Sequence, residues 1–468
     1  MSMLKLRTIR EAMLIASLGI CAVAQNNPPT QPTPPPPAFG QNAPILNPDN
    51  PPLSGLDEPS LELKTASRSF VSPMLLAAES GDSNGQNLIG GSGAEAITTL
   101  MGALDLQKFW PKSDLFLEYV GGAGIGNDPY YVRQLQAAGL EAVTRWRTGE
   151  LTLHDAFSYL PDGSYYAETS IGFPGYGIAA GGLGLNTLPG MFHFNSTATG
   201  IGVGDIPRLQ NTALADIVQA ITPRSAVTVV GAYSNSHFYH NTDDLVNGDQ
   251  TTIEAGYSHL VSRHDQVAVI YAWQLFRFPL NAGGEIYNQV VNLRWSHTIS
   301  GRMSFVGEVG PQYTDLRYGG VSHTSWSPAG RAVFRYRFEH ASLMASYEKF
   351  VSQGSGFFAG ADTQVAQVSL RRPLGRTYDL LVEAGYSHNT RLQPIVLAGV
   401  AANSYDEEFA GATIRKHFGR NFDLFAAYRF GEVSFDAQVA LSGSVGKTNQ
   451  RQIGTVGLEW HPKPTRID

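Results

Sequence analysis

Cysteine and charge are both scarce in this chain. Cys21 is the one cysteine among 468 residues, and 16% of the residues are charged, against about a quarter in ordinary soluble domains. A single thiol excludes an intramolecular disulfide and a cysteine-based metal site. The formal net charge of -7 at pH 7 argues against a nucleic-acid binder, because such proteins are normally basic. We therefore expect no nucleic-acid partner.

Long apolar runs are also missing. After residue 24 no run reaches the roughly 18 uninterrupted apolar residues that a membrane-spanning helix requires. The chain is therefore either soluble or crosses a membrane as strands. Its 50 Gly, 20 Tyr and 23 Phe favour β-structure with aromatic side chains near a polar boundary.

The N-terminus has the pattern of an export signal. Basic residues such as Lys5 and Arg10 precede a short apolar stretch, and an Ala-x-Ala cleavage site ends at Ala24. We expect a signal peptide over residues 1–24, which is cleaved during export. Residues 25–66 begin with a stretch rich in Pro, Asn and Gln, so we expect a disordered periplasmic segment.

From about residue 67 to residue 461 the chain alternates apolar residues with small or polar ones, which is the period of a β-strand. Val267 and Tyr271, for example, share one face of a predicted strand, while Ala268 and Ala272 share the other. Each predicted strand therefore has one strongly apolar face.

Short polar segments and longer loops alternate between these strands. Eight short segments lie at residues 110–113, 147–149, 222–225, 262–265, 300–302, 338–341, 374–377 and 418–421. Longer connections, rich in Gly, Asn, Asp and Ser, include residues 237–249, 389–404 and 434–450. In outer-membrane barrels the periplasmic turns are short and the extracellular loops are longer. This rhythm predicts about 18 strands, or about 16 if the hairpin at residues 67–110 is absent.

The fold prediction also follows from the hydrogen bonds of the backbone. In hydrocarbon every N–H and C=O group needs an internal partner, so strands can cross a membrane only as a closed barrel. We predict an all-β fold, a transmembrane antiparallel up-and-down β-barrel over residues 67–461, with a C-terminal tail at 462–468. A soluble β-protein would instead show short strands at regular spacing, without two classes of turn.

Charged residues fall mainly on the faces opposite the apolar ones. Because Arg or Lys on the lipid face near the bilayer midplane costs about 2–4 kcal/mol, we expect these charges in the lumen. The candidate pore-lining residues are Arg145, Arg147, Arg294, Glu308, Arg331, Arg335, Arg337, Glu348, Arg371, Glu383, Arg415 and Arg429. Opposed rings of charge in a pore select among solutes, whereas Arg–Glu pairs can also simply brace a lumen. The sequence leaves both interpretations open.

No catalytic, cofactor or metal site is predicted. Ser258 and His259 are adjacent on a strand, so their side chains point to opposite faces and cannot form a nucleophile–base pair within it. The 12 His show no metal-binding spacing. Glu-Ala-Gly-Tyr-Ser-His occurs at 254–259 and again at 383–388, either as a paired site or as two strands with interfacial Tyr and His. The Gly-dense segment 173–204 is either a constriction or an external loop.

The strand that ends in Ile453-Gly-Thr-Val-Gly-Leu-Glu-Trp460, the Gly-Arg turns and the hairpin at 113–121 resemble porin-like outer-membrane β-barrels of Gram-negative bacteria. The resemblance covers the architecture of about residues 67–460. It implies a non-enzymatic barrel in the cell outer membrane, in contact with its lipid and, during biogenesis, with the barrel-assembly machinery.

Two functions are compatible with such a barrel. The first is a channel for passive or charge-selective diffusion of small hydrophilic solutes. The alternative is a non-conducting surface barrel for adhesion or binding through its extracellular loops. Neither the solute nor the oligomeric state follows from the sequence, which allows a homo-oligomer.

Overall fold

A computed structural model describes most of the chain after residue 68. The described residues are 69–85, 89–91, 93–126, 132–160, 207–239, 245–278, 284–300, 302–352, 356, 358–375, 377–393, 401–419, 421–441 and 444–467. The predicted signal peptide, the Pro-rich segment and the Gly-dense segment 173–204 lie outside these ranges. Within them no helix is long and apolar enough to span a membrane.

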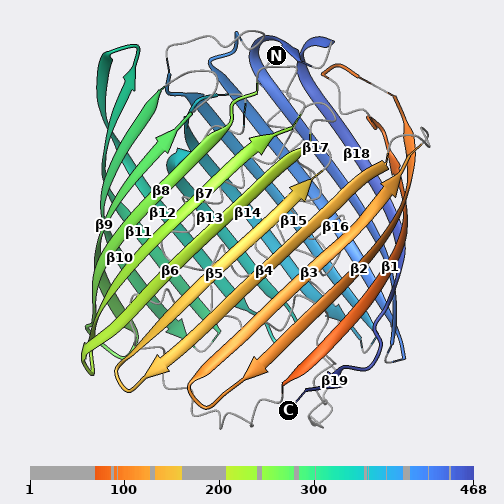
Figure 1. The fold of residues 1–468 in the computed structure, drawn as a ribbon, viewed down its shortest axis with the longest axis horizontal. Coiled ribbons are helices and arrows are strands. Elements are labelled where there is room, and N and C mark those ends of the chain that lie inside the picture. The colour runs from red at the N-terminus through yellow and green to blue at the C-terminus, as the bar shows by residue number, and fades with distance from the viewer. Residues whose placement is uncertain are drawn as a thin grey trace. The chain divides into compact units, whose positions relative to one another are not determined.

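The described residues form one antiparallel sheet in which each strand pairs with its neighbours along the chain (Figure 1). The eighteen long strands in this part of the chain are β1 (Phe70–Asp82), β2 (Glu95–Phe109), β3 (Ser113–Ile125), β4 (Val132–Trp146), β5 (Gly149–Leu160), β6 (Arg208–Thr222), β7 (Ser225–Phe238), β8 (Gly248–Leu260), β9 (Asp265–Arg277), β10 (Glu285–Ser300), β11 (Met303–Tyr318), β12 (Val321–Arg337), β13 (Ser342–Ser352), β14 (Ala361–Leu374), β15 (Tyr378–Arg391), β16 (Ser404–Phe418), β17 (Phe422–Leu441) and β18 (Ser444–Trp460). Because β18 also pairs with β1, the sheet closes on itself. The predicted up-and-down barrel is confirmed, with 18 strands rather than 16.

The seam between β1 and β18 is held by polar pairs as well as by the backbone ladder. Arg451 Nε donates to Asp82 Oδ2 over 2.7 Å, and both side chains are almost fully buried. The hydroxyl groups of Ser80 and Thr455 lie 2.9 Å apart on the same face. Residues more than 360 positions apart in the chain therefore lock the barrel closed.

The C-terminal tail continues along this seam. Beyond Trp460 the chain forms β19 (Thr465–Arg466), which pairs with Phe70 and Val71 at the start of β1. The backbone N–H of Ile467 donates to Ser69 O over 3.2 Å. The first and last described residues thus meet at the same end of the barrel.

All eight short turns predicted from the sequence coincide with connections at that end, from β2–β3 to β16–β17. We refer to it as the periplasmic end, because short turns face the periplasm in such barrels. The opposite end, here the extracellular end, carries most of the longer connections. One exception is the turn between β11 and β12, made by Gly319 and Gly320 with φ values of 56° and 80°. Positive φ at both central residues is what a two-residue hairpin turn requires.

The predicted long connection at 434–450 is wrong. β17 runs to Leu441 and β18 begins at Ser444, with a register irregularity between Ser434 and Val439. The Gly, Ser and Asn residues of this segment suggested a loop. Phe435 and Val439, however, are buried in an apolar cluster, and this burial keeps the segment in the sheet.

The outer face of the barrel is apolar and exposed. Leu75, Leu100, Val269, Leu293 and Val456 point outwards from the strands and are more than half exposed. Exposed aromatic side chains at or next to the periplasmic ends of the strands include Trp110, Trp146, Phe338, Tyr378, Phe418, Phe422 and Trp460. An apolar band bordered by an aromatic girdle is the lipid-facing surface of an outer-membrane barrel.

Candidate functional site in the barrel lumen

The strand register places the predicted charged residues on the inward face. Exposure alternates sharply along β10, where Leu293 is 58% exposed on the lipid face and Arg294 is 3% exposed. Side chains directly opposite each other on neighbouring strands share a face. Following the register from Arg294 around the sheet gives the same inward face for Arg145, Arg294, Glu308, Arg331, Arg335, Arg337, Glu348, Arg371, Glu383, Arg415 and Arg429.

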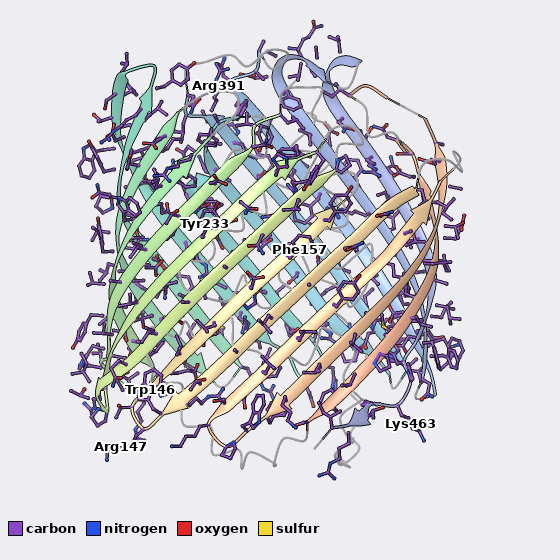
Figure 2. All side chains as sticks on the ribbon, in the orientation of Figure 1. Trp146, Arg147, Phe157, Tyr233, Arg391 and Lys463 are labelled. Atoms are coloured by element: carbon purple, nitrogen blue, oxygen red, sulfur yellow. The ribbon has the colours of Figure 1, made fainter. Side chains whose placement is uncertain are left out.

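Arg147 is the exception among the predicted residues. It lies in the turn between β4 and β5 and is exposed. Figure 2 shows Arg147 beside Trp146 at the periplasmic end, opposite the end that carries Arg391. Arg147 is also the first residue of the short turn predicted at 147–149, and the structure places it in that turn rather than on the inward face of β4.

Four of the inward charges form a row across four strands. Arg294, Glu308, Arg331 and Glu348 are directly opposed to one another on β10, β11, β12 and β13. Arg294 Nη2 lies 2.6 Å from Glu308 Oε2. Arg331 Nε lies 3.3 Å from Glu348 Oε1. We call these four residues the charge row, in which positive and negative groups alternate.

The charge row has a further hydrogen bond from a neighbouring side chain and is sharply bounded. Asn292 Nδ2 donates to the second oxygen of Glu308 over 2.6 Å. The strand positions that flank the row are Ala268 on β9 and Val365 on β14. A buried charge without a partner would be very costly, so each charge of the row stabilises its neighbours in place.

Other inward charges gather towards the periplasmic end. Arg145 binds both Asp114 and Glu150, with 2.8 Å between its Nε and Glu150 Oε2. Arg337 and Arg371 flank Ser342 from the two neighbouring strands and are both exposed. The lumen therefore has a paired middle and a basic patch near one exit.

A further polar cluster lies at the periplasmic rim, on the inward face of β15 to β18. Asp423 is directly opposed to His417 on one side and to Glu459 on the other. His417 lies 2.8 Å from Asp423 and 2.9 Å from Asp379 through its two ring nitrogens. His461, two residues beyond Glu459, joins them.

The charge of His461 follows from this environment. Its Nε2 lies 3.2 Å from Glu459 Oε2 and 3.5 Å from Asp423 Oδ2. Burial by itself would lower the pKa of His461, but the hydrogen bonds with the two carboxyl groups raise it to about 9. Sequence reasoning missed both histidines, although the spacings Arg415-x-His417 and Glu459-x-His461 place each pair on one face.

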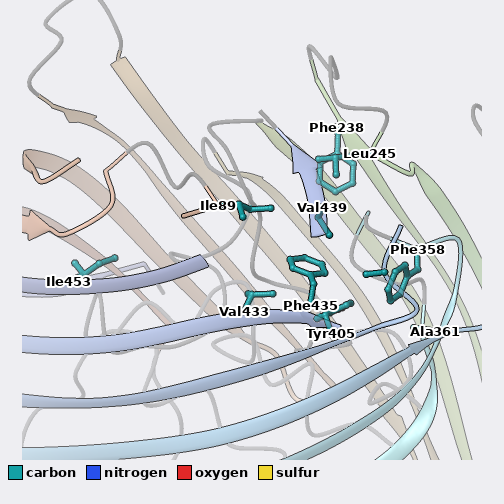
Figure 3. Close-up of a cluster of buried hydrophobic side chains, with 11 residues drawn as sticks. Ile89, Phe238, Leu245, Phe358, Ala361, Tyr405, Val433, Phe435, Val439 and Ile453 are labelled. Carbon is teal, nitrogen blue, oxygen red and sulfur yellow. The ribbon is translucent and has the colours of Figure 1, made fainter. Parts of the chain in front are cut away.

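Apolar side chains cross the extracellular mouth (Figure 3). Phe238 and Leu245, at the connection of β7 to β8, belong to one buried cluster with Tyr405 of β16. Since β7 and β16 are nine strands apart in an eighteen-stranded barrel, they lie on opposite walls. The mouth cluster comprises Ile89, Phe238, Leu245, Phe358, Ala361, Ala402, Tyr405, Val433, Phe435, Val439 and Ile453.

Specific contacts hold the mouth cluster together. The Tyr405 ring lies 5.4 Å from the Phe358 ring and 5.7 Å from the Phe435 ring, measured between centroids. The N–H of Val246 donates to Gly356 O over 2.8 Å, which joins the β7–β8 and β13–β14 connections. The described parts of these two connections are therefore held to each other at the extracellular end.

The repeated Glu-Ala-Gly-Tyr-Ser-His segments do not form a paired site. His259 lies near the periplasmic end of β8, where its Nδ1 is 2.8 Å from Ser225 Oγ on the facing strand. His388 lies near the extracellular end of β15, where its Nδ1 is 2.6 Å from Asp406 Oδ1. Both histidines point outwards at opposite ends of the barrel, so they fit the two interfacial belts.

Two contacts here resemble a nucleophile and a base. Ser225 Oγ lies 2.8 Å from His259 Nδ1, and Thr390 Oγ1 lies 3.2 Å from Nε2 of His388, whose other ring nitrogen contacts Asp406. Within the described residues no acidic side chain hydrogen-bonds His259, and Tyr257 donates its own hydroxyl to Ser225 over 3.1 Å. A nucleophile–base pair normally needs a third group to orient the base. The Ser225–His259 contact has no such third group among the described residues.

Comparison with known proteins gives structural matches alone. No protein-family model matches the chain, and no curated protein matches it in sequence. OpdQ of Pseudomonas aeruginosa is 10% identical, with a TM-score of 0.41 over 85% of this chain and 99% of that one. OccK2 (OpdF) of Pseudomonas aeruginosa, in complex with glucuronate, is 9% identical, with a TM-score of 0.42 over 85% and 98%. The ferric-catecholate import receptor Fiu of E. coli K12 is 8% identical, with a TM-score of 0.41 over 85% and 82%.

Proposed function

We propose that this barrel is a channel of the cell outer membrane for small hydrophilic solutes, which it selects by charge. The charge row, with Arg294 and Glu308 facing the lumen from opposed strands, is the observation that carries the proposal. Charges on four neighbouring strands make this wall of the lumen polar, which suits the passage of hydrophilic solutes.

The mechanism that we propose needs no covalent step. Alternating charges on one wall offer donor and acceptor groups side by side, which favours solutes with polar or zwitterionic groups over apolar ones. The exposed pair Arg337 and Arg371 raises the local concentration of anions at the periplasmic exit. Passage is passive and is limited by size and charge.

The mouth cluster favours a second candidate, a barrel that is closed in its resting state and presents its loops as a binding surface. Phe238, Phe358 and Tyr405 are buried together across the lumen entrance. An apolar barrier of this kind opposes the passage of ions.

Single-channel recording in planar bilayers separates these functions. Steady openings of the wild-type chain support the open channel. Silent wild-type protein combined with openings of the double variant Phe238→Ala/Phe358→Ala supports a closed mouth over a conducting lumen. If both proteins are folded and silent, the channel proposal is wrong.

Charge selection is tested in the same bilayers under a salt gradient. Replacing Arg335, Arg337 and Arg371 with Ala removes positive charge from the lumen and should shift the reversal potential towards cation selectivity. Arg147→Ala removes one positive charge from a turn outside the lumen, and Arg337→Ala is its single-charge counterpart in the lumen. Equal shifts in these two single variants would contradict selection by the lumen.

A further inference from the structure

The periplasmic rim cluster has the arrangement of ligands around a divalent metal. Asp423 and Glu459 are directly opposed residues of β17 and β18, and His461 follows two positions after Glu459. One ligand atom from each of the three side chains lies within 4.8 Å of the other two. Asp423 and Glu459 are buried, at 8% and 1% exposure.

Distances around His461 fit metal ligation better than a single hydrogen bond. Its Nε2 faces Glu459 Oε2 at 3.2 Å and Asp423 Oδ2 at 3.5 Å. One N–H group that is shared between two oxygens at such lengths makes two weak hydrogen bonds. Zinc bonds of about 2.0–2.2 Å at tetrahedral angles would separate ligand atoms by about 3.3–3.6 Å.

The second oxygen of each carboxylate contacts a neighbouring side chain on the side away from His461. Glu459 Oε1 accepts from Arg415 Nη2 over 3.1 Å. Asp423 Oδ1 lies 2.8 Å from Nδ1 of His417, and the other ring nitrogen of His417 lies 2.9 Å from Asp379. Metal ligands are commonly oriented by such outer hydrogen bonds. Here these bonds aim Oδ2 and Oε2 at the same imidazole nitrogen.

We propose that Asp423, Glu459 and His461 bind a Zn²⁺ ion at the periplasmic rim of the barrel, with His417 and Arg415 as positioning residues. Carboxylate and imidazole are ligands that zinc accepts, and three protein ligands leave a fourth position for water. The ion joins the end of β18 to β17 at the point where the chain leaves for β19. It would therefore fix the start of the C-terminal segment to the barrel wall beside the seam between β1 and β18.

The test is a titration of the full-length folded barrel with Zn²⁺ in chelator-free buffer, followed by calorimetry. Co²⁺ as a spectroscopic probe reports on the geometry of ligation. We expect one ion per chain, a tetrahedral Co²⁺ spectrum and a rise in melting temperature on addition of Zn²⁺. His461→Ala should abolish all three, and His417→Ala should weaken binding about 10–100-fold.

His297→Ala is the matched control. His297 lies at the same end of the barrel, contacts Asp265 at 2.7 Å and faces outwards, so its loss should leave Zn²⁺ binding unchanged. The melting temperature of each variant without metal shows that the barrel is folded. No stoichiometric binding by the wild-type chain, or equal binding by His461→Ala, would establish an ion-pair cluster and overturn the metal site.

Discussion

At the scale of residues, the lumen is organised by compensation between buried charges. Arg294 and Glu308 are paired at 2.6 Å with side chains that are 4% and 8% exposed. Removing one partner of a buried pair leaves the other charge without compensation, whereas replacing both with apolar residues is often neutral. If water in the lumen reaches the pair, it should contribute little to the free energy of unfolding, because exposed ion pairs contribute about 0–1 kcal/mol.

We therefore expect Glu308→Ala to lower the free energy of unfolding by about 3–5 kcal/mol. The double variant Arg294→Leu/Glu308→Leu should recover most of that loss. Urea unfolding in lipid vesicles, followed by tryptophan fluorescence, measures both values. A loss below about 1 kcal/mol for Glu308→Ala would mean that water bathes the charge row.

At the scale of elements, the connections decide where the strands end. The turn between β11 and β12 depends on Gly319 and Gly320, whose φ values are positive. A Cβ atom on Gly319 would meet no other atom within 4 Å. If a side chain at position 319 destabilises the barrel, the cause is therefore the backbone conformation and not a steric clash.

Gly319→Ala should destabilise the barrel by about 1–2 kcal/mol, the cost of the left-handed conformation for an L-residue. Gly81→Ala is the control, because Gly81 in β1 also has open space around it and no positive φ. Its substitution should leave stability unchanged or slightly raised. Equal losses in the two variants, measured by urea unfolding, would show that backbone strain is not the cause.

At the scale of the whole molecule, closure depends on contacts between the two ends of the sheet. Asp82 and Arg451 pair across the seam with no exposed side-chain surface, and β19 extends the seam along β1. No turn connects β1 to β18, so the barrel stays closed only through contacts between these two strands. Loss of the Asp82–Arg451 pair should therefore destabilise the whole barrel.

Asp82→Ala is expected to lower the free energy of unfolding by about 3–5 kcal/mol. The temperature at which the folded barrel loses its fast migration on a semi-native gel should fall accordingly. Arg277→Ala breaks an ion pair with Glu285 between β9 and β10, in which the two side chains are 58% and 39% exposed, and should cost less than about 1 kcal/mol. Equal unfolding temperatures of the two variants would show that the seam has no special role in stability.

Much of the barrel could be predicted from local sequence. Alternation along residues such as Val267 to Ala272 specifies two faces, and the eight short polar segments mark one end of the sheet. Both signals arise from neighbours in the chain, since the strand period is two and turn residues act over a few positions. The inward face of Arg331 and Glu348 follows from the same alternation.

Tertiary structure decided which residues meet. Three pairs depend on the register between strands. They are Arg294 with Glu308, Asp82 with Arg451, and Asp423 with His461. Phe238 and Tyr405 meet across the mouth only because the sheet closes. The sequence by itself determined the faces and the eight short turns, and it limited the number of strands to about 16 or 18. The structure decided the charge row, the mouth cluster and the rim cluster, because contacts between distant residues require the pairing of the whole sheet.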